Sequence, residues 1–91
     1  MHPSLADVPA DKAFFCCTGA RVTNLSGLAN TVEHMEENAF NHHVTTDRND
    51  FATWVHDVVK DEALFRLLRH EANKYWFAQK VRGHVHYLGG Q

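Results

Sequence analysis

The sequence has only two cysteines, no long apolar run and no excess of basic residues, and each shortage excludes a class of protein. Cys16 and Cys17 are adjacent, so a single chain cannot form a disulfide framework. No apolar run approaches the roughly 20 residues that cross a bilayer. The N-terminal residues also lack the basic start and the apolar stretch of a secretory signal. We therefore expect a cytoplasmic protein without a membrane partner.

Length and composition indicate one ordinary globular domain. The chain has 91 residues, of which 44% are hydrophobic and 22% are charged. Its net charge of −2 is distributed unevenly, because residues 1–62 contain ten acidic and four basic residues and residues 63–91 contain one and five. The acidic first part argues against a nucleic-acid-binding domain, which is usually basic overall. A protein partner or self-association fits this dipolar charge better.

The densest structural signal lies in the middle of the chain. Apolar residues follow one another there at the spacing of an amphipathic helix: Phe51, Trp54, Val55, Val58 and Val59. A polar segment precedes them, in which Thr46, Asp47 or Asp50 could cap the first turn. The pattern predicts a helix over 51–59 with Trp54 at the centre of the core.

Shorter patterns predict the elements that precede this helix. Lys12 to Cys17 is apolar and is followed by turn-forming residues, which indicates an extended segment. Asn24 is suited to cap a helix whose apolar residues recur every three or four positions, namely Leu25, Leu28, Val32 and Met35. A short helical turn is expected over 37–43.

The last helix is predicted to be the longest. It should run from Glu62 to about Arg82, with Gly83 just beyond its end. Its core-facing stripe is formed by Leu64, Leu68, Ala72 and Tyr75. After it, residues 84–88 alternate like a strand that could pair with residues 14–17.

Together these elements predict a mainly α fold, a compact small helical domain of three to four helices with a short N-terminal extended segment. We expect a flexible leader over 1–11, one domain over 12–88 and a flexible tail over 89–91. The sequence contains no internal repeat and no low-complexity tract that would divide the domain further.

Four short motifs stand at specific spacings between residues 12 and 69. They are a Phe-x-Cys-x-Gly-like segment, Asn-Leu-x-x-Leu, Phe-x-x-His-Val and Asn-Asp-Phe-x-x-Trp-Val-x-Asp-Val, at residues 14–19, 24–28, 40–44 and 49–58. In these motifs the chain resembles an uncharacterised bacterial and archaeal family of small domains of unknown function. The doubled Cys16-Cys17 departs from that pattern. The resemblance implies a compact, mostly helical domain, and it implies no catalytic role or ligand.

Eight histidines raise the question of a metal site. His84 and His86 would lie on one side of a strand, and Cys16 or Cys17 could add ligands if the two ends of the chain pair. A structural zinc site needs four protein ligands, and a catalytic site needs three and a water. These four residues are the metal candidates, but ordinary hydrogen-bonded histidines are favoured and we predict no cofactor.

A small enzyme that uses the region of His42, His43 and Asp50 is a further alternative. One histidine would act as a general base, and Asp50 would orient it. The simpler interpretation is a histidine that ties down the loop before the next helix. No nucleophile motif, phosphate-binding glycine loop or His-Glu-x-x-His pattern accompanies these residues. We therefore assign no catalytic residue and favour a non-enzymatic role.

The C-terminal helix carries the predicted contact surface. Tyr75, Trp76 and Phe77 are consecutive and span about 200° of the helix circumference, so one core cannot take all three. Phe77 and Val81 should be exposed within a polar rim formed by Arg66, His70 and Asn73. These five residues are the predicted partner site of a protein-binding or assembly module, and the acidic residues at 33–37 are a candidate complement. A nucleic-acid-binding accessory is the third alternative, because these aromatic residues stand among the basic residues of this helix.

Overall fold

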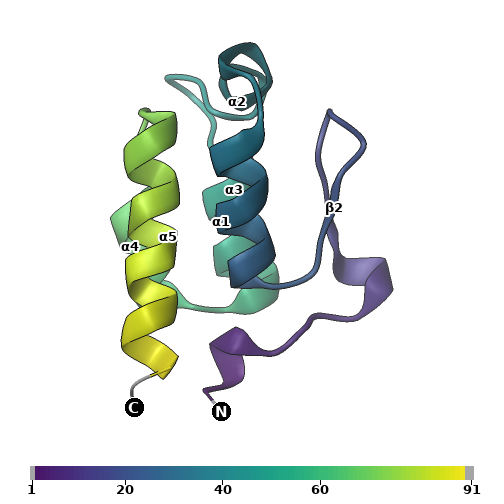
Figure 1. Ribbon diagram of the computed structural model, residues 1–91, viewed down its shortest axis with the longest axis vertical. Helices are drawn as coiled ribbons and strands as arrows, with labels where there is room; N and C mark the ends of the chain where they lie inside the picture. The colour runs from purple at the N-terminus through teal and green to yellow at the C-terminus, as the bar shows by residue number, and fades with distance from the viewer. Residues whose placement is uncertain (1, 90–91) are drawn as a thin grey trace.

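Five α-helices and one β-hairpin make up the part of the fold that the computed structural model describes, residues 2–89 (Figure 1). The chain begins with two 3₁₀ turns, η1 (Pro3–Leu5) and η2 (Ala10–Lys12), followed by strands β1 (Phe14–Phe15) and β2 (Arg21–Val22). The helices are α1 (Leu25–His34), α2 (Glu37–His43), α3 (Asp50–Trp54), α4 (Glu62–Leu68) and α5 (Lys74–Gly89), and a π-helical turn, η3 (Val55–Val59), extends α3. The mainly α fold with a short N-terminal extended segment is therefore confirmed, although the described helices number five rather than three to four.

Side-chain caps begin four of the five α-helices. Asn24, Asn49, Asp61 and Asn73 each accept a hydrogen bond from a backbone amide three residues further on, at 2.7, 3.0, 2.9 and 2.9 Å. Each bond satisfies one of the amide groups that a first helical turn leaves without a partner. The prediction of Asn24 as a cap is confirmed. The cap of α3 is Asn49 rather than Thr46, Asp47 or Asp50.

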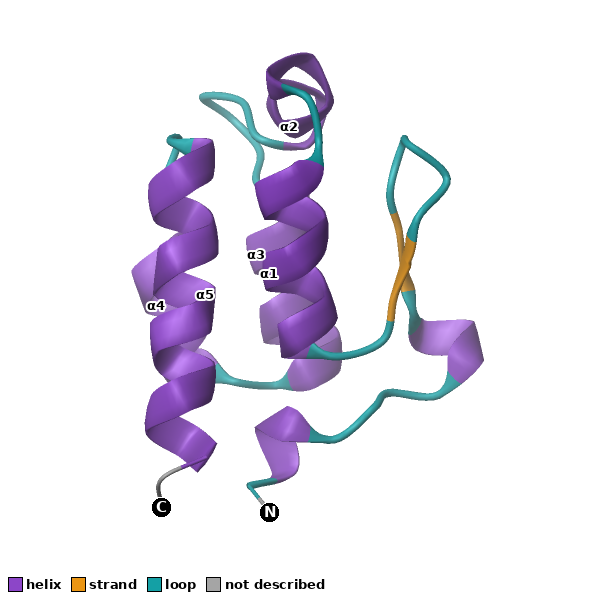
Figure 2. Cartoon of the chain, viewed as in Figure 1, coloured by secondary structure: helices purple, strands orange, loops and turns teal. Residues whose placement is uncertain are grey.

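The two strands form a short antiparallel hairpin, shown in orange in Figure 2. Phe14 lies opposite Val22, and Phe15 lies opposite Arg21. The turn between the strands closes with a 2.9 Å bond from the Gly19 amide to the Cys16 carbonyl, and Gly19 has a φ of 93° that a side chain would disfavour. The hairpin thus holds both cysteines at the end of β1.

The two longest helices, α1 and α5, pack side by side and run in opposite directions (Figure 1). The N- and C-terminal ends of the chain lie at the same end of the molecule.

The helix predicted over residues 51–59 is present in the structure, because α3 and η3 together cover residues 50–59.

Phe51 occupies the centre of the aromatic core. Its ring centroid lies 5.0 Å from that of Phe14, 6.0 Å from that of Phe40 and 5.6 Å from that of Phe77. These contacts join α3 to β1, α2 and α5. Trp54 is buried as predicted, but it lies at the edge of this cluster, where its indole N–H donates to the Lys12 carbonyl at 2.9 Å.

The C-terminal part of the chain differs from its prediction. The single helix expected over 62–82 is broken at residues 69–73, and the strand expected at 84–88 is the last part of α5. Val85 and Leu88 pack on the domain, and their burial outweighs the roughly 1 kcal/mol that a glycine such as Gly83 costs within a helix. The tail consequently does not pair with β1.

Phe77 and Val81 are fully buried, so the prediction that they form an exposed contact surface is wrong. Because α5 starts anew after the break at residues 69–73, Phe77 does not lie at the angle that a continuous helix would give it. Its ring centroid is 5.6 Å from the ring centroids of both Phe40 and Phe51. Tyr75, which the unbroken stripe placed in the core, is exposed instead.

Residues 2–11 lie against the domain rather than apart from it. The Val8 amide donates to the Thr23 carbonyl at 2.8 Å, Ser4 is buried, and η1 contacts α1 and α5. Of the ends predicted to be flexible, Met1 and residues 90–91 lie outside the described residues, and Gly89 is the last residue of α5. Within residues 2–89, no helix is long and apolar enough to cross a membrane.

We expect Phe51→Ala to lower the free energy of unfolding by about 3 to 5 kcal/mol, because it removes the ring that four elements share. Phe15→Ala is the matched control, since the Phe15 ring is 58% exposed and should matter by less than about 1 kcal/mol. Urea denaturation of both variants measures the difference. Equal losses in the two variants would contradict the central position of Phe51.

Candidate functional site

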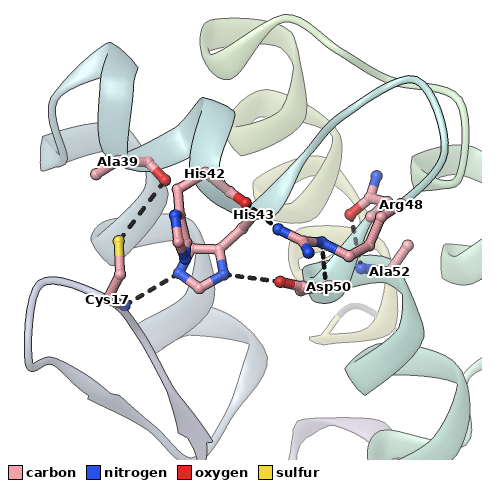
Figure 3. Close-up of polar contacts among 8 residues, drawn as sticks. Cys17, Ala39, His42, His43, Arg48, Asp50 and Ala52 are labelled. Atoms are coloured by element: carbon pink, nitrogen blue, oxygen red, sulfur yellow. Dashed lines mark hydrogen bonds and ion pairs between the residues drawn. The ribbon is translucent and has the colours of Figure 1, made fainter.

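Three segments, of which the hairpin is far from the other two in sequence, meet at one group of polar side chains (Figure 3). Cys17 stands at the hairpin turn, His43 is the last residue of α2, and Asp50 is the first residue of α3. The His43 ring lies between the other two residues. The predicted proximity of His43 and Asp50 is present in the structure.

Both ring nitrogens of His43 are hydrogen-bonded. Nε2 accepts from the Cys17 amide at 3.0 Å, and Nδ1 lies 3.0 Å from a carboxylate oxygen of Asp50. Because an amide can only donate, Nε2 must carry the lone pair, and Nδ1 must carry the hydrogen that it donates to Asp50. The contacts therefore select one tautomer of the ring.

The surroundings of His43 hold this arrangement in place. The side chain is buried, and the rings of Phe14 and Phe51 pack on it with centroids at 5.2 and 5.0 Å. The other oxygen of Asp50 lies 3.2 Å from Nε of Arg48, whose guanidinium also donates to the His42 carbonyl. His43 thus ties the hairpin, α2 and α3 together.

The cysteines lie on the Nε2 side of this ring. Cys16 is buried and Cys17 is exposed, and the two sulfur atoms and a ring nitrogen of His43 lie within 4.8 Å of one another. Cys16, Cys17 and His43 form the cysteine–histidine cluster. Among residues 2–89 it is the one group of three or more His, Cys, Asp or Glu side chains with this spacing.

Two features of the cluster argue against a reactive Cys17 thiolate. Desolvation by the surrounding protein and the neighbouring Cys16 thiol raise the pKa of the Cys17 thiol, which reduces the fraction of reactive thiolate. Nε2 of His43, which would serve as the base, already accepts the Cys17 amide hydrogen. These contacts fit the simpler interpretation of a histidine that ties down a loop.

The other two metal candidates lie elsewhere. His84 and His86 are on α5, two residues apart, and so point about 200° away from each other rather than to one side. Nε2 of His84 lies 2.8 Å from Asp61, and both side chains are largely buried. The less favoured alternative, in which these histidines join the cysteines across paired chain ends, is therefore not what the structure has.

The corner between α4 and α5 exposes two large aromatic side chains. Tyr75 and Trp76 are 60% and 56% exposed, with ring centroids 5.0 Å apart. Leu67, Arg69 and His70 are exposed nearby in the chain, and these five residues form the α4–α5 corner. A hollow of about 150 Å³ lies next to it, between residues 44–46 and residues 69–72.

Most other cations of the C-terminal half are already paired within the chain. Arg66 pairs with Glu62, Lys80 with Glu71, and Arg82 with Glu33 of α1. Arg69, in contrast, has no ion pair within residues 2–89. Glu33 of α1 thus already neutralises one cation of α5 within the chain.

No protein-family model, curated protein or solved structure matches this chain.

Asp61→Ala should lower the free energy of unfolding by about 2 to 4 kcal/mol at neutral pH, because it removes both the α4 cap and the partner of His84. Burial alone would raise the pKa of Asp61, but hydrogen bonds from the Leu64 amide, His84 and Ser4 and the charge of His84 lower it overall. This stabilisation is fully present above the ordinary carboxyl pKa and is lost as the pH falls through the lowered value.

Urea denaturation of Asp61→Ala and wild type across acidic and neutral pH measures this effect. The difference between the two proteins should shrink at the acid end. Asp57→Ala, at an exposed carboxylate that pairs with His56, is the control and should cost less than about 1 kcal/mol. A difference for Asp61→Ala that stays constant down to strongly acidic pH would exclude a stabilising Asp61 carboxylate.

Proposed function

We propose that the chain is a non-enzymatic protein-binding module whose contact surface is the α4–α5 corner. The observation that carries this proposal is the exposure of Tyr75 and Trp76, two adjacent aromatic rings on the first turns of α5. A few residues provide most of the binding energy in protein interfaces, and Trp and Tyr are enriched among them. The C-terminal helix thus remains the proposed contact element, through residues other than Phe77 and Val81.

These aromatic side chains lie outside the hydrophobic core, which favours a role in recognition. Phe77 points into the core, and successive residues on a helix are about 100° apart. Tyr75 and Trp76 therefore point outward. Asn73 caps the helix at the Trp76 amide and so fixes the start of the helix from which both rings project.

The charge around the rings favours a partner with an acidic surface. Arg69 and His70 are exposed just before these rings in the chain, and Arg69 has no ion pair within residues 2–89. Interfaces commonly combine aromatic and arginine side chains at the centre with polar groups around them. A second copy of this chain could supply Glu36 and Glu37, which are exposed at the start of α2.

Two other roles are weighed against this one. Metal binding at the cysteine–histidine cluster is compatible with it, because the cluster and the α4–α5 corner share no residue. A nucleic-acid partner is disfavoured, since the first 62 residues carry ten acidic side chains that repel phosphates. The free cysteines suit a reducing compartment, and we place the protein in the cytoplasm.

Affinity capture from the native host, followed by mass spectrometry, tests the proposal with Trp76→Ala, Tyr75→Ala and the control Tyr87→Ala. Tyr87 is 62% exposed on the same helix but lies three turns away. We expect a partner whose binding falls about tenfold or more in the first two variants and is unchanged in the third. The partner should also dissociate more readily at high salt, because exposed charges are screened.

Circular dichroism establishes that all three variants keep the wild-type helix content. Light scattering of the purified chain distinguishes self-association from a different partner. An unchanged set of bound proteins in Trp76→Ala and Tyr75→Ala would refute the α4–α5 corner as the contact surface.

A further inference from the structure

We propose that Cys16, Cys17 and His43 form a binding site for a thiophilic metal ion, Zn²⁺ in the first instance. This inference is independent of the proposed protein-binding role. It starts from the cysteine–histidine cluster, in which two sulfur atoms and one imidazole nitrogen from two separate segments lie within 4.8 Å of one another.

The three donors are of the type and spacing that zinc requires. Thiolate sulfur and imidazole nitrogen are its preferred protein ligands, with bonds of about 2.3 and 2.0 to 2.1 Å. A tetrahedral ion with such bonds would hold its sulfur atoms about 3.8 Å apart and a nitrogen about 3.5 Å from a sulfur. The distances between the three donor atoms, which are at most 4.8 Å, would need to shorten by about 1 Å to reach these values.

The partner of His43 on its far side supports a ligand role. Metal-binding histidines commonly donate their other ring N–H to a carboxylate, which fixes the ring and makes the ligating nitrogen more basic. Asp50 accepts from Nδ1 of His43 at 3.0 Å, and Arg48 holds the other Asp50 oxygen at 3.2 Å (Figure 3). Nε2, the nitrogen that carries the lone pair, is therefore the one beside the cysteines.

Binding would exchange weak contacts for metal bonds. The Nε2 lone pair leaves the Cys17 amide, and the Cys17 thiol leaves the Ala39 carbonyl that it contacts at 3.9 Å. Each thiol releases its proton to solvent as its sulfur–zinc bond forms, so two protons leave for each ion and nothing is oxidised. The Cys17 amide can then bond to water, because Cys17 lies at the surface.

Three protein ligands leave one coordination position open. Cys17 is exposed while Cys16 and His43 are buried, so the open position faces solvent on the Cys17 side. Water would occupy this position in the isolated chain.

Titration of the reduced, tag-free chain with Co²⁺ and then Zn²⁺ tests the site, since cobalt bound to thiolates has a strong sulfur-to-metal absorption. We expect one cobalt ion per chain with this absorption, displaced by an equimolar amount of zinc. Cys17→Ser should lose about half of the absorption per bound cobalt, because Cys16 remains, and should bind at least about tenfold more weakly. Asp50→Asn should keep the absorption but bind about 10 to 100 times more weakly, because Asp50 is a positioning residue.

His86→Ala is the matched control, an exposed histidine on α5 outside the cluster, and its titration should equal that of the wild type. Alkylation of the wild type by iodoacetamide gives a second readout that does not depend on any variant folding, and zinc should slow the modification of Cys17. Absence of sulfur-to-cobalt absorption in the folded wild type would overturn the proposal. Equal affinity in wild type and a folded Cys17→Ser would overturn it as well.

Discussion

The packing of Phe51 against Phe14, Phe40 and Phe77 is the contact on which the rest of the structure depends. One ring from α3 joins the hairpin, α2 and α5, so the short elements of a 91-residue chain share a single apolar centre. A domain of this size buries a limited area, and the loss of one shared ring would expose the faces of several elements at once.

The same cluster explains why the cysteines and His43 meet. His43 packs on Phe14 and Phe51, and a buried imidazole must have hydrogen-bond partners for both nitrogens. The hairpin amide and the Asp50 carboxylate provide them, and no buried side-chain nitrogen or oxygen within residues 2–89 is left without a partner. A structural requirement thus places two thiols beside a histidine of fixed tautomer, which is the arrangement that a metal ion could use.

Local patterns predicted the elements that local interactions determine. The range of α1 and of the α3–η3 segment followed from apolar spacing, and Asn24 followed from cap chemistry. The break at residues 69–73 was missed because Leu64, Leu68 and Tyr75 continue one helical stripe across it. Asn73 was the available signal, since it caps α5 and turns Phe77 inward. The pairing of His43 with Asp50 was considered because the two residues are close in sequence. The contact of His43 with Cys17 spans 26 residues and depends on the folded hairpin.

The tautomer of His43 is the most direct test of this site, because it depends on the hairpin, α2 and α3 together. Long-range proton–nitrogen correlation spectra of the ¹⁵N-labelled, metal-free protein at neutral pH distinguish the two ring nitrogens. We expect Nδ1 to carry the hydrogen, with slow exchange because it is held by Asp50, and Nε2 to be unprotonated. A hydrogen on Nε2, or rapid exchange between the two tautomers, would show that the Cys17 amide and Asp50 do not hold the ring.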